Sequence, residues 1–121
     1  MFKIQKTDKR FKANSLYNYQ AKPLDSVISK SIGRTRPFDY SYSLLKFLKA
    51  RNWCTEQWGA GHEIDVCLVL NRHEPEMINP HWAYEIDYAV GGFLPKFRIY
   101  LKGKEEASFF ALVWANGDSN D

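Results

Sequence analysis

The chain has 121 residues, of which 45% are hydrophobic and 26% are charged, and its formal net charge is +3. These values are typical of a globular domain and argue against a disordered protein or a membrane protein. The longest nearly apolar stretches, residues 66–70 and 109–115, are far shorter than the roughly 18 consecutive residues that span a bilayer. We therefore expect one domain over residues 1–121, with no membrane partner.

Two features of the sequence bear on the cellular compartment. No apolar stretch of about 7–15 residues follows the charged residues 1–10, so the start of the chain does not resemble a secretory signal. A chain of this size with an ample core needs no disulfide, and we expect Cys54 and Cys67 to be reduced. Both features predict a cytoplasmic protein.

The first third of the chain predicts short strands and a long loop. Phe2 and Ile4 alternate with polar residues, which indicates a short edge strand, and Tyr17 and Tyr19 alternate with polar residues in the same way. Residues 22–37 are rich in Pro, Ser and Gly and have few apolar anchors. We expect this segment to be a mobile loop.

Residues 38–52 carry the clearest helical pattern. Leu44, Leu45, Phe47 and Leu48 recur at helical spacing, and Asp39 precedes them at a position that can cap the first turn. We expect this helix to stop at Asn52. A separate short turn over residues 55–58 is predicted to end at Gly59.

The second half of the chain alternates between apolar and polar residues. Residues 62–71, 81–88 and 97–102 each show the period of two that is typical of a strand. Residues 104–114 begin with charged residues and continue with apolar residues at a spacing of three and four, which favours a short helix. The polar tail, residues 116–121, is expected to be mobile.

These elements together predict an α+β fold. We expect a three- to four-stranded, mainly antiparallel sheet, with one main helix at about residues 38–52 and a short C-terminal helix packed on one face. The aromatic share of 16% is high, so much of the core must be aromatic, including the four Trp residues. Any Trp left exposed would mark an interface.

The C-terminal part of the chain combines an aromatic strand with the sequences Lys-Gly-Lys-Glu-Glu-Ala and Phe-Phe-Ala-Leu-Val-Trp. This ending resembles that of many short uncharacterised phage and mobile-element proteins. The resemblance covers residues 97–114 alone. It implies an accessory protein of a mobile element, and it carries over no functional residues.

A repeated Glu-Ile-Asp tripeptide is the sharpest candidate for chemistry. Glu63, Asp65, Glu85 and Asp87 would lie on neighbouring predicted strands, and four carboxylates on one sheet face could hold Mg²⁺ or Mn²⁺ for hydrolysis of a phosphodiester. The alternative is a solvated outer face, on which Arg98 and Lys102 pair with Glu85 and Asp87. The second interpretation is the simpler one.

The basic residues gather in the first half of the chain. Residues 1–60 carry twelve Lys or Arg and four acids, whereas residues 61–121 carry five Lys or Arg and ten acids. Cations and aromatic rings on the loop and the main helix could contact phosphates and stack on bases, which makes nucleic acid an alternative partner. The candidate residues are Arg34, Arg36, Lys46, Lys49, Tyr40 and Tyr42.

Known catalytic and cofactor patterns are missing from the sequence. Cys54 and Cys67 form no Cys-x-x-Cys pair, no Gly-x-Ser-x-Gly elbow occurs, and the Gly-rich turns lack the spacing of a phosphate-binding loop. We therefore predict a small non-catalytic binding protein with a protein partner and no cofactor. A nucleic-acid-binding protein and a metal-dependent hydrolase or nuclease are the two alternatives.

Overall fold

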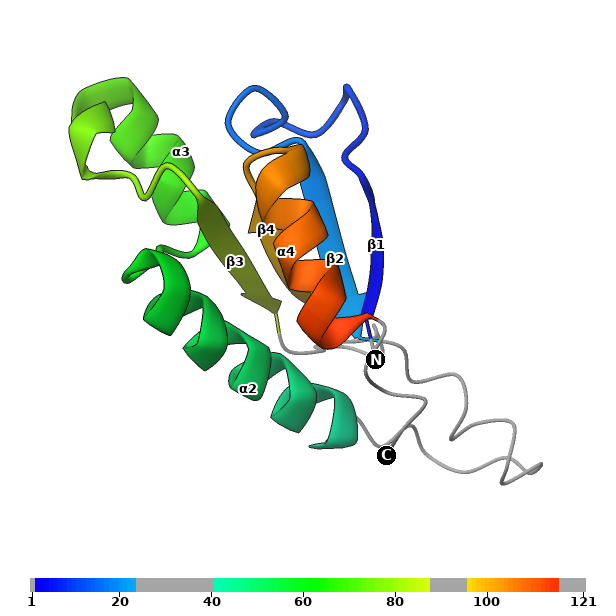
Figure 1. The fold of residues 1–121 in the computed structure, drawn as a ribbon. Helices are drawn as coiled ribbons and strands as arrows, with labels where there is room; N and C mark the ends of the chain where they lie inside the picture. The colour runs from blue at the N-terminus through cyan, green and yellow to red at the C-terminus, as the bar shows by residue number, and fades with distance from the viewer. Residues whose placement is uncertain (1, 24–40, 88–95, 116–121) are drawn as a thin grey trace, which may run out of the picture.

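The computed structural model describes residues 2–23, 41–87 and 96–115. Its strands form one four-stranded sheet in the order β1-β2-β4-β3, and each neighbouring pair is antiparallel (Figure 1). The α+β prediction is confirmed. In chain order the elements are β1 (Phe2–Lys6), β2 (Tyr19–Pro23), α2 (Ser41–Trp58), α3 (Ile64–His73), the single 3-10 turn η1 (Pro75–Met77), β3 (Trp82–Asp87), β4 (Lys96–Leu101) and α4 (Lys104–Trp114).

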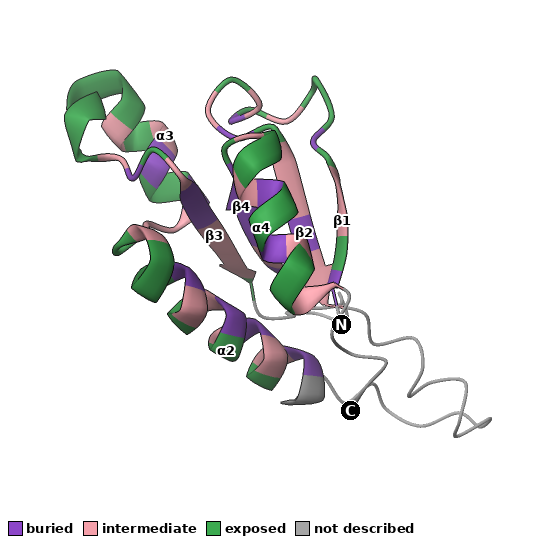
Figure 2. Ribbon diagram, viewed as in Figure 1, coloured by how far each residue is buried: buried purple, intermediate pink, exposed green. Residues whose placement is uncertain are grey.

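One face of the sheet carries the main core. Alternation along the strands places apolar side chains on this face, where α2 and α4 cover them. Figure 2 shows the buried residues of α2 as a stripe on the side that faces β3. The predicted packing of the main and C-terminal helices on one face is confirmed. The buried residues of this cluster are Phe2, Ala21, Phe47, Ala50, Cys54, Trp82, Phe97, Ile99, Leu101, Ala107 and Phe110.

The opposite face is covered at one end only by the described elements. A second cluster there joins residues 13–17 to α3 and to the end of the sheet where β3 begins (Figure 1). Tyr17, Ile64, Cys67 and Tyr100 are its largest buried members. Strand positions farther from α3 on this face hold polar side chains, as expected for a sheet with one solvated surface.

The strand predicted at residues 62–71 is wrong, because Ile64–His73 is the helix α3. Its apolar residues fit both periods: Ile64, Cys67 and Leu68 also recur at three and four residues and pack against the sheet as a helical stripe. The cost is that Val66 and Val69 remain 43% and 49% exposed. Just before the helix, a single parallel bridge between Glu63 and Tyr84 connects the described chain to β3, and the helix itself packs on Ala83.

The predicted stop of the main helix at Asn52 is also wrong. Cys54 continues the buried stripe of Phe47 and Ala50 at helical spacing, so one helix runs through to Trp58 and the separate turn at 55–58 does not form. The predicted stop at Gly59 is confirmed, since its φ of 88° is readily adopted only by glycine. The predicted helix start at residues 38–40 lies outside the described residues.

Three further predictions can be placed on the structure. Most of the predicted loop at 22–37 and all of the tail at 116–121 lie outside the described residues, while Lys22 and Pro23 belong to β2. Cys54 and Cys67 are free and buried in separate clusters on the two sheet faces. None of the described helices is both long and apolar enough to span a bilayer.

Gly61 allows close packing of the chain against the buried Trp82. A Cβ atom on Gly61 would lie 2.7 Å from Cε2 of Trp82, a side chain that is 1% exposed and bonded through Nε1 to the Gly59 carbonyl at 2.8 Å. We expect Gly61→Ser to lower the free energy of unfolding by about 1–3 kcal/mol, because the ring cannot move aside. Urea denaturation measures this change.

Gly103→Ser is the matched control for this prediction. A Cβ atom on Gly103 would lie 3.8 Å from Oε1 of Glu106, and the position is a helix N-cap, where Ser is favoured. We expect it to be neutral or stabilising. Equal free energies of unfolding for the two Ser variants would contradict the packing argument.

Candidate binding site

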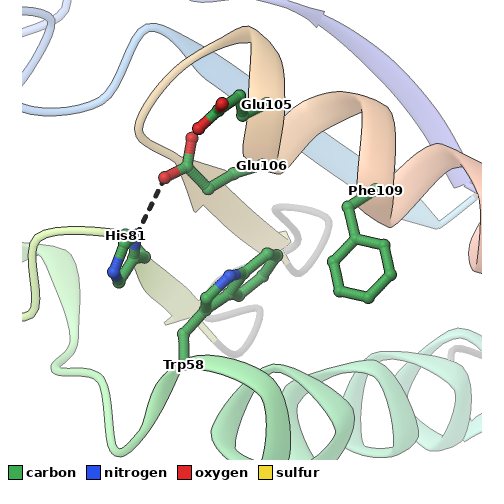
Figure 3. A pocket seen from close by; sticks show the side chains of 5 residues that line it. All are labelled: Trp58, His81, Glu105, Glu106 and Phe109. Carbon is green, nitrogen blue, oxygen red and sulfur yellow. Dashed lines mark hydrogen bonds and ion pairs between the residues drawn. The ribbon is translucent and has the colours of Figure 1, made fainter.

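A pocket of about 250 Å³ lies where the end of α2, the start of β3 and the first turns of α4 meet. Figure 3 shows Trp58 rising from α2, His81 beside it, and Glu105, Glu106 and Phe109 descending from α4. Three elements that are far apart in the sequence therefore supply its walls. No sequence motif connects them, because the pocket depends on how the helices meet.

Asn79 holds two of these walls in place. Its Nδ2 donates to the carbonyl oxygens of Trp58, Gly59 and Ala60 at 3.0, 3.3 and 3.1 Å, and its Oδ1 accepts the backbone N–H of His81 at 2.8 Å. The last carbonyls of a helix lack partners within the helix, so this amide acts as a cap for α2. It fixes the end of α2 relative to the start of β3.

Tyr17 ties this arrangement to the opposite face of the sheet. Its buried hydroxyl donates to the carbonyl oxygen of Asn79 at 2.8 Å and lies 3.8 Å from Sγ of Cys67. Burial, and then the neighbouring Cys67, raise the pKa of Tyr17, so it stays a neutral donor. Residues 58–61 and 79–82 are thus anchored from both sides.

Glu106 links α4 to His81. Its Oε2 lies 2.8 Å from Nδ1 of His81, and its Oε1 accepts the N–H of Gly103 at 3.2 Å. Partial burial would raise the pKa of Glu106, but hydrogen bonds from His81 and from the backbone N–H groups of Glu106 and Gly103 outweigh it and lower the pKa. The carboxylate therefore caps the first turn of α4 and also orients the imidazole.

Aromatic rings form the remaining walls. The Trp58 ring lies between His81 and Phe109: it stacks on His81 with centroids 6.3 Å apart at 23°, and meets Phe109 at 6.0 Å and 78° (Figure 3). Trp53 supports both, at 5.5 Å from Trp58 and 5.1 Å from Phe109. The prediction that every Trp is core is confirmed for Trp82, which is fully buried. The other three, Trp53, Trp58 and Trp114, are partly buried and pack against the core, and Trp58 also lines the pocket.

Next to the pocket, α4 exposes three large apolar side chains. Phe109, Leu112 and Val113 are 41%, 70% and 42% exposed, and we call them the outer face of α4. Ala107 and Phe110 attach the helix to the core on its other side. Phe109 belongs both to the outer face and to the pocket, so the two features form one continuous surface.

The basic residues predicted from the sequence do not form a described site. Arg34, Arg36 and Tyr40 lie outside the described residues, and Tyr42 belongs to α2 although its side chain is not part of the description. Lys46 is half-buried and Lys49 is exposed on α2. They lie on the helix layer, away from the polar face of the sheet.

The four acids proposed as a metal site fall on different kinds of element. Glu63 precedes α3 and Asp65 lies in its first turn, whereas Glu85 and Asp87 are on β3, so the predicted pair of neighbouring strands is wrong. Glu85 accepts the hydroxyl of Tyr100 at 2.8 Å. Within the described part of the chain, no group of three or more His, Cys, Asp or Glu residues could hold a metal ion.

The register supports the solvated-face interpretation of β3. Arg98 lies directly opposite Glu85, as that interpretation expects, and Lys96 rather than Lys102 lies opposite Asp87. Opposite charges at such positions stabilise a sheet by about 0.2–1 kcal/mol. Within the described residues, however, Glu85 and Arg98 form no ion pair: Glu85 accepts from Tyr100, and Arg98 donates to Gln20.

Comparison with protein-family models, with curated proteins and with solved structures finds no match to this chain. Its function is therefore argued from the geometry of its surfaces. Sequence reasoning missed His81, Trp58 and Asn79 as members of one site. The only local signal was Glu106, three residues after Gly103 at the start of a predicted helix, which is a pattern typical of helix capping.

Asn79 gives a direct test of how the pocket is held. We expect Asn79→Asp to lower the free energy of unfolding by about 2–4 kcal/mol, because a buried carboxylate would face three carbonyl oxygens that now accept hydrogen bonds. Urea denaturation at neutral pH measures the loss. Asn71→Asp, on the exposed side of α3, makes the same chemical change and should alter stability by less than about 0.5 kcal/mol. Similar losses in both variants would refute the role of Asn79.

Proposed function

We propose that this chain is a small, non-catalytic binding protein of the cytoplasm that docks a partner protein on the outer face of α4. The observation that carries the proposal is the exposure of Phe109, Leu112 and Val113 beside a pocket with aromatic walls. The resemblance of residues 97–114 to phage and mobile-element proteins fits an accessory factor of such an element.

The spacing of the outer face supports docking over chance exposure. Leu112 and Val113 follow Phe109 at three and four residues, so the three side chains lie on one side of α4 and form a ridge. Burying a Leu or Val side chain contributes about 1.5–3 kcal/mol, and Leu112 is the most exposed large apolar residue of the described chain. A partner that covers this ridge and also reaches into the pocket would gain binding free energy from both contacts.

A binding role also fits the chemistry of the pocket. His81 and Glu106 resemble the base and orienting carboxylate of a catalytic triad, but the lining residues that the structure describes include no Ser, Thr or Cys to serve as nucleophile. The capping of α4 by Glu106 gives the pair a structural purpose. These points favour a non-catalytic protein.

The docking proposal predicts that substitutions on the outer face of α4 weaken partner binding, whereas substitutions on α3 do not. With the wild type immobilised, partners would be enriched from host cytosol, identified by mass spectrometry, and their affinity measured with purified components. Leu112→Ser/Val113→Ser should weaken binding at least tenfold, because the partner loses two buried apolar contacts.

The double variant Val66→Ser/Val69→Ser is the matched control, since these valines have similar exposure on α3. We expect it to bind within about twofold of the wild type. Partners that bind both double variants as tightly as the wild type would end the proposal. A concentration-dependent dimer that only Leu112→Ser/Val113→Ser abolishes would instead identify the partner as a second copy of the chain.

A nucleic-acid-binding protein remains the second candidate, favoured by a row of cations on the polar face of the sheet. Lys3 on β1 lies directly opposite Lys22 on β2. On β4, Arg98 comes one residue before Ile99, the partner of Ala21, and has Glu85 of β3 opposite it on the other side. Like charges directly opposite each other destabilise a sheet. A polyanion bound on this face would offset that repulsion.

The row of cations predicts a salt-dependent interaction. If nucleic acid binds here, Lys3→Gln/Lys22→Gln should weaken binding of a labelled single- or double-stranded oligonucleotide and reduce the slope of log K against log salt by about 1.4–1.8. Fluorescence anisotropy between 50 and 200 mM salt, roughly the range over which such contacts weaken, measures both.

The variant Lys46→Gln/Lys49→Gln tests whether nucleic acid binds to the basic helix α2 instead of the polar face of the sheet. Loss of binding in this variant alone would place the nucleic-acid site on the helix and loop that the sequence indicates. No binding by the wild type at the lowest salt would exclude nucleic acid as the partner.

A further inference from the structure

The pocket beside the outer face of α4 has a composition that selects one class of group. We propose that it receives the ammonium or guanidinium end of a lysine or arginine side chain on the docked partner. This inference rests on the proposed docking function and names the chemistry by which the partner is recognised.

The aromatic walls supply the first part of the argument. The rings of Trp58 and Phe109 meet at 78° with centroids 6.0 Å apart, so they form a corner in which a cation can approach more than one ring (Figure 3). A cation within about 6 Å of an aromatic face is attracted by the ring quadrupole, which typically changes affinity by about 2- to 30-fold. Trp gives the strongest attraction of this kind.

The carboxylates supply the second part. Glu105 is exposed at the rim of the pocket, and within the described chain it makes no hydrogen bond or ion pair. Glu106 is held in place by His81 and by the N–H of Gly103, and its lowered pKa keeps it ionised at neutral pH. The described titratable groups that line the pocket are therefore two carboxylates and one imidazole.

The position of the pocket at the start of α4 does not make it an anion site. The positive end of the helix macrodipole would attract an anion, but Glu106 already occupies the N–H of Gly103. An anion would also face the carboxylates of Glu105 and Glu106. Charge complementarity accordingly points to a cation.

The size and place of the pocket point to a side chain rather than a free ligand. Its volume of about 250 Å³ lies below the range of roughly 300–1,000 Å³ that is typical of small-molecule sites. Phe109 is shared with the outer face, so a peptide segment on Leu112 and Val113 passes the mouth of the pocket. One long side chain of that segment is enough to fill it.

The test measures the NMR chemical shift of the Trp58 indole N–H while Nα-acetyl-lysine amide or Nα-acetyl-arginine amide is titrated into the protein. The signal is assigned by its loss in Trp58→Phe. Neutral norleucine and citrulline counterparts serve as matched ligands, and tetramethylammonium represents a free cation. We expect millimolar binding of the two cationic amides and at least tenfold weaker binding of their neutral counterparts, because only the cations meet the carboxylates and rings.

Three variants locate the binding. Glu105→Gln and Phe109→Leu should each lower the affinity for the lysine amide at least threefold. The first removes the exposed charge, and the second removes one aromatic face. Glu76→Gln, an exposed acid on η1, should change nothing. Equal binding of charged and neutral amides, or unchanged binding in both pocket variants, would overturn the inference.

The last arm separates this inference from the docking proposal. Leu112→Ser/Val113→Ser should lower the affinity for a Lys-Leu dipeptide amide but leave the affinity for the lysine amide unchanged, because only the Leu side chain of the dipeptide reaches the outer face of α4. If the cationic amides fail to bind while the partner still docks on α4, the cation inference falls and the docking proposal stands. Tetramethylammonium binding as tightly as the Lys-Leu dipeptide would show that the pocket takes a free cation, and that result would overturn the assignment to a partner side chain.

Discussion

The hydrogen bonds of Asn79 are the constraint on which the pocket between α2, β3 and α4 depends. One buried amide satisfies the carbonyls of residues 58–60 and the N–H of His81. Without it, the carbonyls of Trp58 and Ala60 would each lose a hydrogen bond worth about 0.5–1.5 kcal/mol, whereas Gly59 would keep the bond from Trp82. Because Trp58 is the last residue of α2 and His81 precedes β3, the same bonds that stabilise the fold also position two walls of the pocket.

The sheet divides the surface of the protein into two different environments. Its apolar face receives α2 and α4, which meet through Trp53, Phe109 and Phe110. Its polar face is covered only near Tyr100 and Ala83 by described elements. Of its charged residues, Lys3, Lys96 and Asp87 are exposed, and Lys22, Glu85 and Arg98 are half-buried. A partner protein on α4 and a polyanion on the sheet would therefore bind to different layers of the molecule, and the two candidate functions do not compete for one surface.

The sequence predicts the elements whose pattern has one interpretation and fails where two periods fit. Residues 81–88 and 97–102 alternate over a full strand, and β3 and β4 form there. In residues 62–71 the apolar positions satisfy both periods, and the length of the segment does not decide between them. The competition is settled by packing, because Ile64 and Cys67 reach the core from a helix.

The candidate site was beyond sequence reasoning for a related reason. Trp58, His81 and Glu106 are separated by more than twenty residues from one another, and no local pattern relates their positions. Asn79 reads as a loop residue in the sequence, since a single Asn after Pro and Met carries no sign that it caps a helix twenty residues away. The helix α4 was predicted, but it was expected to pack its apolar residues on the sheet, and the exposure of Phe109, Leu112 and Val113 was not foreseen.

The high aromatic content follows from how α4 is attached. Trp53 contacts Trp58, Phe109, Phe110 and Trp114 at centroid distances between 5.1 and 6.3 Å, and Phe2 continues the array beneath α4. Such rings are rigid and lose little side-chain freedom when a ligand binds. Because Phe109 is both the exposed end of this array and a wall of the pocket, a partner that docks there as proposed would meet a side chain already ordered by the core, and its binding would need little further immobilisation of that ring.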